Sequence, residues 1–159
     1  MRKLFTFLAV AVAFSSCLKL GTKLTYKKGE LYYTENVTKA EAEKLGNYLV
    51  TAGFFTDDHA ITSQVDRKGD TVLFRFVVQP AYIDKEDYVR STATFCTELS
   101  EKVFENKPVA IHYCDDKMKT KKIVYPIPAP GSTGLLKVRS LLNTNFYIIQ
   151  LLVRSTPLA

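Results

Sequence analysis

Residues Thr71 to Gln79 read T-V-L-F-R-F-V-V-Q and form the most strand-like stretch of the chain. The stretch is rich in β-branched and aromatic residues, lacks Gly and Pro, and follows the turn-forming sequence D-R-K-G-D at 66–70. An edge strand usually keeps one polar face, whereas apolar residues occupy both faces here. The pattern therefore predicts a strand in the middle of a sheet.

Two amphipathic helices are predicted, one before and one after this strand. The first begins at Thr38, which can cap the helix while Glu41 reaches back to the Thr38 amide, and it ends at Gly53. The second covers about 84–106, where apolar residues recur every three or four positions. Further strands are predicted at 30–34, 59–66 and 109–113.

The predicted order of elements is strand, helix, strand, strand, helix, strand. This order is that of the split βαβ, or ferredoxin-like, arrangement. We therefore expect one α+β domain at 30–125, a βαββαβ sandwich with two helices on one face of an antiparallel sheet. The first and third strands should lie in its centre. The chain has 159 residues, 47% of them hydrophobic, which suffices for one domain with its own core.

The first 16 residues have the features of an export signal. Two basic residues precede an apolar run at 4–14, which is too short to span a bilayer permanently. The small residues at 11–13 fit ordinary signal peptidase and predict a secreted protein. The sequence F-S-S-C at 14–17 instead resembles a bacterial lipobox with Cys17 as the lipid-modified residue. This second interpretation predicts a lipoprotein of the bacterial cell envelope, in the periplasm or at the outer membrane.

The segments that flank the predicted domain differ from it in composition. Residues 17–29 are polar and Lys-rich and are expected to form a tether. Residues 126–134 are rich in Pro and Gly and are expected to form a linker. The apolar tail at 135–159 is interrupted by charged and Asn residues. It fits an added strand, an interfacial helix, or a segment packed on the open sheet face.

The charge balance is mildly basic. The formal net charge is +6, and removal of Arg2 and Lys3 with the signal leaves +4. An excess of this size suits an anionic surface such as lipid headgroups or a cell-wall polymer, or simply a solvated face. Export argues against a nucleic-acid partner.

No catalytic signature is present in the sequence. There is no nucleophile elbow around a serine and no Gly-rich phosphate loop, so neither an enzyme nor a cofactor is expected. His112 and Cys114 lie two apart in a predicted strand, followed by Asp115, and such residues can bind a metal ion. A closed site needs two more ligands, so no metal site is expected.

The remaining cysteine, Cys96, could pair with Cys114 in an oxidising compartment. Cys114 has the opposite strand parity to Ile111, so it should point away from the helix that carries Cys96. We therefore expect two buried free thiols, with a disulfide as the alternative.

The helix-free face of the predicted sheet is the candidate binding surface. Parity places five side chains on it: Tyr32, Leu73, Arg75, Val77 and His112. Among them Tyr32, Arg75 and His112 are the candidate ligand-binding residues, with Tyr32 and Arg75 on neighbouring central strands. The alternative is that the tail at 135–159 covers this face.

Two resemblances are visible. The segment from Gly29 to Phe55, together with G-D-T-V-L-F-R-F-V-V at 69–78, resembles a group of uncharacterised exported bacterial proteins. More loosely, the order of elements and the helix that ends at Gly53 resemble SPOR domains, which implies peptidoglycan binding on the sheet face.

The sequence therefore predicts an exported, non-enzymatic interaction module, tethered to the membrane through Cys17, with a protein or envelope polymer as its partner. One alternative is a SPOR-like peptidoglycan-binding module. The other is a small metal-binding protein or enzyme centred on His112 and Cys114.

Overall fold

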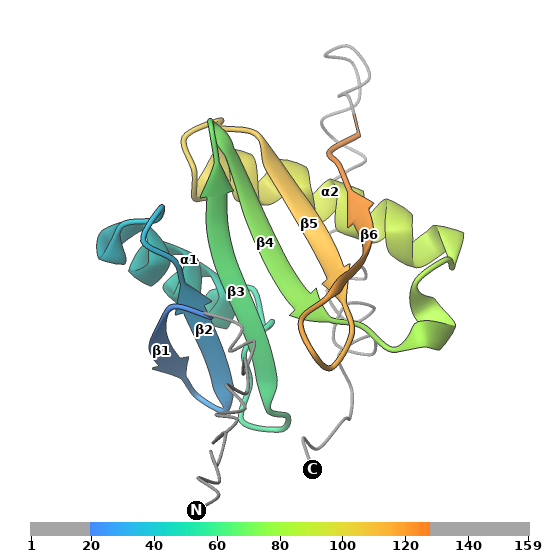
Figure 1. Ribbon diagram of the computed structural model, residues 1–159, viewed down its shortest axis with the longest axis horizontal. Coiled ribbons are helices and arrows are strands. Elements are labelled where there is room, and N and C mark those ends of the chain that lie inside the picture. Colours follow the sequence, from blue (N-terminus) through green and yellow to red (C-terminus); the bar gives the residue numbers. More distant parts are fainter. Residues whose placement is uncertain (1–19, 128–159) are drawn as a thin grey trace, which may run out of the picture.

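Six strands and two helices form an α+β fold in the computed structural model, which describes residues 20–127 (Figure 1). The strands are β1 (Thr22–Tyr26), β2 (Gly29–Tyr33), β3 (Ile61–Lys68), β4 (Thr71–Val77), β5 (Val109–Cys114) and β6 (Thr120–Val124). The helices are α1 (Lys39–Thr51) and α2 (Glu86–Lys102), with a short 3₁₀ helix, η1, at Pro80–Tyr82.

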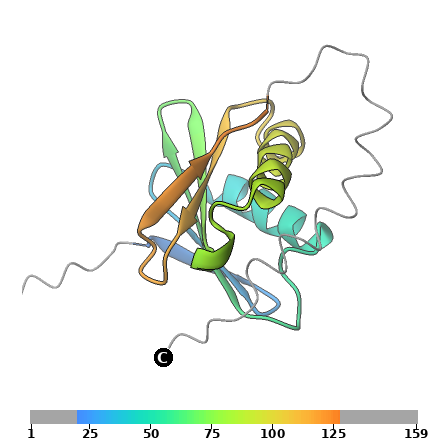
Figure 2. The ribbon, with the colours of Figure 1, turned by 90° about the vertical axis from the view of Figure 1, so that its right-hand side faces the viewer.

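The strands lie side by side in the order in which the chain forms them. The pairs β1–β2, β3–β4 and β5–β6 are antiparallel, whereas β2–β3 and β4–β5 are parallel. Helix α1 joins one parallel pair and helix α2 joins the other. Both helices pack on the same face of the sheet, so the other face carries no helix (Figure 2).

The expected ferredoxin-like arrangement with an antiparallel sheet is not confirmed. In a split βαβ unit another strand separates the two strands that the helix joins, whereas here those strands are direct neighbours. The sheet is mixed, and β3 and β4 lie at its centre. Hydrophobic patterns show that a helix joins two strands, but they do not show whether a third strand lies between them.

Two edge strands extend the predicted set. β1 lies inside 17–29, where a tether was expected, and β6 follows the last predicted strand. The Tyr26 ring of β1 stacks on Phe55, with 6.0 Å between ring centroids, and lies against Gly46 of α1. A Cβ atom at Gly46 would meet this ring at 2.1 Å, so the glycine provides the space for it.

The predicted cap of α1 is confirmed. The Glu41 amide donates to Thr38 Oγ1 and the Thr38 amide donates to Glu41 Oε2, both at 3.2 Å. Gly53 follows the helix with a φ of 75°, a left-handed conformation that glycine adopts without strain. Neither described helix has the length and apolar content that a membrane crossing needs.

The core lies between β4 and the two helices. Val72, Phe74 and Phe76 of β4 are completely buried and alternate with half-buried residues on the other face. The Phe54 ring lies 5.6 Å from the Phe74 ring and 5.4 Å from the Phe76 ring. This confirms the prediction from sequence parity of which side of the strand faces the helices.

We predict that Phe74→Ala lowers the free energy of unfolding by about 3–5 kcal/mol, because it deletes a fully buried ring from this cluster. Arg75→Ala, on the opposite face, serves as the neighbouring control and should cost clearly less. Denaturant unfolding of both variants measures the difference. A larger loss for Arg75→Ala would contradict this assignment of the two faces.

Candidate functional site

One row of side chains crosses the whole sheet on its helix-free face. In order from β1 to β6, this cross-sheet row consists of Lys23, Tyr32, Gln64, Arg75, His112 and Ile123. With about 4.8 Å between neighbouring strands, the row is about 24 Å long. All three ligand-binding residues predicted from the sequence belong to it.

Two details of the row differ from the expectation. Tyr32 and Arg75 do not lie on neighbouring strands, because Gln64 of β3 separates them. The Tyr32 hydroxyl donates to Glu30 Oε2 at 3.1 Å, and the same carboxylate accepts from Lys23 Nζ at 3.0 Å. Tyr32 therefore belongs to a separate polar group near the β1 edge, and Arg75 occupies the middle of the row.

Arg75 is held by weak interactions. Its Nη1 donates to Gln64 Oε1 at 3.4 Å, and its Nη2 lies 3.9 Å from the Asp66 carboxylate. The Asp66 carboxylate accepts shorter hydrogen bonds from Thr34 and Asn36. The guanidinium therefore has N–H groups left to donate to a further acceptor on the open face.

His112 lies beside Arg75 and is nearly buried, with 8% of its surface exposed. Its Nδ1 lies 3.1 Å from Thr120 Oγ1. Burial, together with the positive charge of Arg75, lowers the pKa of His112. The imidazole is therefore neutral at neutral pH and acts as a polar, uncharged member of the row.

Cys96 and Cys114 are free and buried, as expected from strand parity. Cys96 Sγ lies 3.5 Å from the Val124 carbonyl oxygen, whereas Cys114 Sγ lies 4.0 Å from Thr120 Oγ1. Burial raises the pKa of the Cys114 thiol and raises that of Cys96 to about 12. Both thiols are therefore protonated at neutral pH, which makes them weak nucleophiles and weak metal ligands.

The described part of the chain contains no group of three or more His, Cys, Asp or Glu side chains that could hold a metal ion. His112 and Cys114 do share the open face, as their spacing predicted. Asp115 accepts from the Lys117 and Lys119 amides and pairs with Lys121, so it stabilises the β5–β6 turn. These residues do not form the closed site that the metal-binding alternative requires.

Charges are balanced over residues 20–127. All 16 acidic residues of the chain lie in this range, whereas six of its 22 basic residues lie outside it. Those six are Arg2, Lys3, Lys19, Lys137, Arg139 and Arg154. The described part therefore has no net formal charge, and the basic excess of the whole chain gives this surface no overall attraction for a polyanion.

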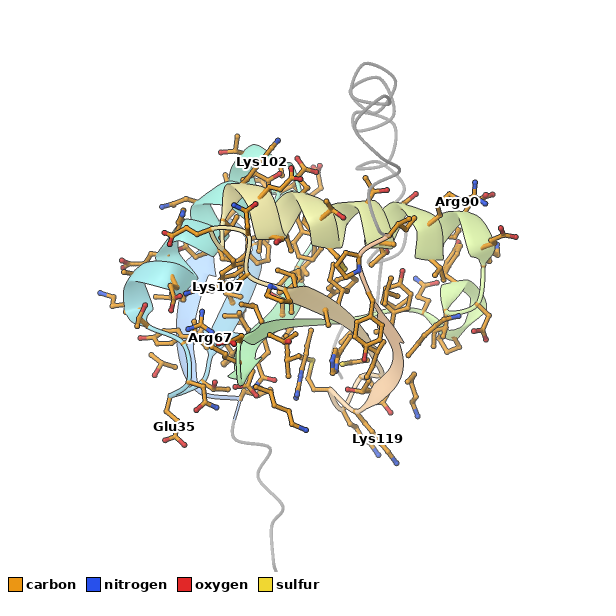
Figure 3. All side chains as sticks on the ribbon, turned by 90° about the horizontal axis from the view of Figure 1, so that it is seen from above. Glu35, Arg67, Arg90, Lys102, Lys107 and Lys119 are labelled. Carbon is orange, nitrogen blue, oxygen red and sulfur yellow. The ribbon has the colours of Figure 1, made fainter. Side chains whose placement is uncertain are left out.

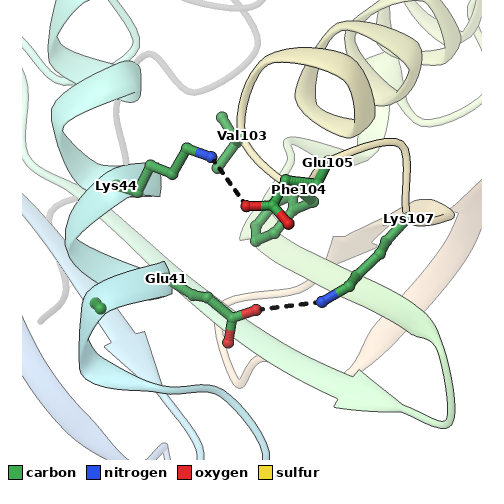
Figure 4. A pocket seen from close by; sticks show the side chains of 7 residues that line it. Glu41, Lys44, Val103, Phe104, Glu105 and Lys107 are labelled. Atoms are coloured by element: carbon green, nitrogen blue, oxygen red, sulfur yellow. Dashed lines mark ion pairs between the residues drawn. The ribbon is translucent and has the colours of Figure 1, made fainter.

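A pocket of about 190 Å³ lies on the helix layer, between α1 and the end of α2 (Figure 4). Lys44 lies 3.9 Å from Glu105, and Lys107 lies 3.8 Å from Glu41. Figure 3 shows Lys102 and Arg90 on this same layer and Lys119 on the opposite side of the sheet. Each charged residue that lines the pocket has a partner within it, so the open face remains the stronger candidate.

A family model matches residues 23–125, nearly the whole described part of the chain, and its description is a family N-terminal domain. The chain belongs to the AF_1994_N family. This membership supports the resemblance to an uncharacterised protein group at the level of the domain. It does not bear on export, on lipid attachment or on the SPOR likeness.

No curated protein and no solved structure matches the chain. The AF_1994_N match runs from the second residue of β1 to just beyond β6, so the family domain includes both edge strands. The description of the family gives no activity.

We predict that Arg75→Gln raises the pKa of His112, because it removes a positive charge that disfavours the imidazolium. An NMR titration in a His59→Gln background would follow His112 alone, since the chain has two histidines. In the parent protein His112 should titrate below the ordinary value of 6.5. Protonation is thus disfavoured in the folded state, and stability should fall as the pH drops through that value. An unchanged pKa in Arg75→Gln would contradict the coupling.

Proposed function

We propose that this chain is an exported, non-enzymatic binding module that is tethered to the membrane through Cys17 and holds its ligand on the cross-sheet row. The observation that carries the proposal is the row itself, in which Tyr32, Arg75 and His112 fall in one line across a face without helices. Arg75, at its middle, has only long contacts to its neighbours. Such a line fits recognition of an extended partner.

The chemistry of the row supports binding over catalysis. His112 is held neutral, and the nearby Cys114 thiol is held protonated, so neither is activated as a nucleophile. Lys23 and Arg75 each lie near a carboxylate, which leaves a face with both donors and acceptors and little net charge. This balance favours a neutral or zwitterionic partner.

A glycan polymer of the envelope, as in the SPOR-like alternative, is the second candidate. A row of about 24 Å would accommodate several sugar units, and its mixed donors and acceptors suit hydroxyl groups. The metal-binding alternative lacks such support, because the described residues assemble no ligand cluster around His112 and Cys114. The proposed location is the bacterial cell envelope, with secretion after cleavage near 11–13 as the alternative.

We predict that Cys17→Ala moves the protein from the membrane fraction to the soluble fraction and leaves it folded. A lipid-modified N-terminal cysteine with several acyl chains anchors a protein strongly, and Ala cannot be modified in this way. Fractionation of cells that express the parent or the variant measures the change. Unchanged membrane association of Cys17→Ala would exclude the proposed tether.

We also predict that the row is shielded in cells by its partner. Lys23→Cys on the row and Lys44→Cys on α1 form a matched pair, because the two lysine side chains are 48% and 49% exposed and each pairs with a glutamate. A maleimide should label Lys23→Cys more slowly in cells than in purified protein, and Lys44→Cys equally in both. Labelling of the parent protein measures the background from Cys17, since Cys96 and Cys114 are buried. Equal labelling of Lys23→Cys in the two samples would contradict a binding role for this face.

A further inference from the structure

The N-terminal end of the described chain lies on the open face. The Gln64 side-chain amide, in the middle of the cross-sheet row, donates to the Leu20 carbonyl oxygen at 2.9 Å. Gly21 then leads into β1 with a φ of 96°, and a Cβ atom at this position would lie 2.1 Å from the Tyr33 carbonyl oxygen. Only glycine fits this close approach, so the backbone conformation at Gly21 fixes the path by which the chain reaches the row.

This contact limits how far the row can be from Cys17. Leu20 follows Cys17 by three positions, and an extended chain spans at most about 3.3–3.6 Å per residue. The Cys17 Cα atom therefore lies within roughly 11 Å of Leu20. A lipid anchor at Cys17 would hold the row next to the membrane surface and place the helices on the far side.

One exposed apolar side chain lies on the same face, and two more follow β6 in the chain. Ile123, the last member of the row, is 41% exposed, and Tyr125 and Ile127 just after β6 are 63% and 46% exposed. Among residues 20–127 these three are the exposed large hydrophobic side chains. Aliphatic side chains and Tyr, with its apolar ring and polar tip, suit the interface between lipid headgroups and acyl chains.

We infer that the open face docks on the headgroup layer of the membrane that holds Cys17, with Ile123 entering the interface and Tyr125 at its rim. This inference rests on the proposed tether, and it identifies the ligand of the row as the lipid surface. Arg75 then meets headgroup oxygens, whereas the buried Gln64 remains bonded to Leu20. Because residues 20–127 carry no net charge, docking does not require anionic lipid.

Single-tryptophan variants test the docked face, because the chain contains no Trp. Ile123→Trp reports on the row, and Glu101→Trp, at an exposed position of α2, is the control on the helix layer. Each full-length protein is mixed with phosphatidylcholine vesicles or with vesicles that also contain phosphatidylglycerol. We expect a blue-shifted emission and a severalfold loss of acrylamide quenching for Ile123→Trp in both mixtures, and no change for Glu101→Trp.

Three outcomes would overturn the inference. Ile123→Trp could stay fully accessible to acrylamide with vesicles while Cys17→Ala still releases the protein in cells, and then the tether stands but the face does not dock. Shielding before any vesicle is added, with a dimer in sedimentation, would identify a second copy as the occupant. Shielding by purified peptidoglycan and not by vesicles would identify a glycan polymer.

Discussion

The packing of Phe54 determines which face of the sheet is covered. Gly53 adopts a φ of 75° after α1, which turns the chain so that the next residue, Phe54, enters the core. There its ring lies 5.6 Å from Phe74 and 5.4 Å from Phe76, both on β4, and 6.4 Å from Phe95 of α2. One side chain thus joins both helices to the central strand. Since both helices lie on this face, every residue of opposite parity is left on the open one.

Two arginines on the central hairpin show how the faces differ. Arg67 of β3 points to the helix side, where its Nη2 lies 2.6 Å from Glu41 Oε1. That hydrogen bond is the main reason why the pKa of Glu41 is lowered to about 2. Glu41 also forms part of the N-terminal cap of α1. Arg75 of β4 points to the open side, and its nearest carboxylate, that of Asp66, is 3.9 Å away. Arg67 therefore stabilises the fold, whereas Arg75 retains capacity for a ligand.

Short sequence patterns predicted the local features correctly. They failed for features that depend on pairing between residues far apart in the sequence. Alternation within 71–79 identified the buried side of β4, and Thr38 with Glu41 identified the start of α1, because these signals depend on neighbours in the sequence. Strand order depends on where each crossover ends, which no short pattern encodes. For the same reason the sequence did not place Gln64 in the row, since register pairs residues that lie far apart in the sequence.

The one-sided sheet also limits where a partner of the tethered protein can lie. Release of Leu20 from Gln64 would cost only about 0.5–1.5 kcal/mol, the net value of one hydrogen bond. The β1–β2 pairing still fixes the chain from Thr22 onward, so release lengthens the lead from Cys17 to about 18 Å at most. The open face would thus stay close to the membrane even when the lead is fully extended. A polymer farther away would face the helix layer, where each charged residue lining the pocket is already paired. In the proposed tethered arrangement, the geometry therefore favours a partner at the membrane surface over a distant polymer.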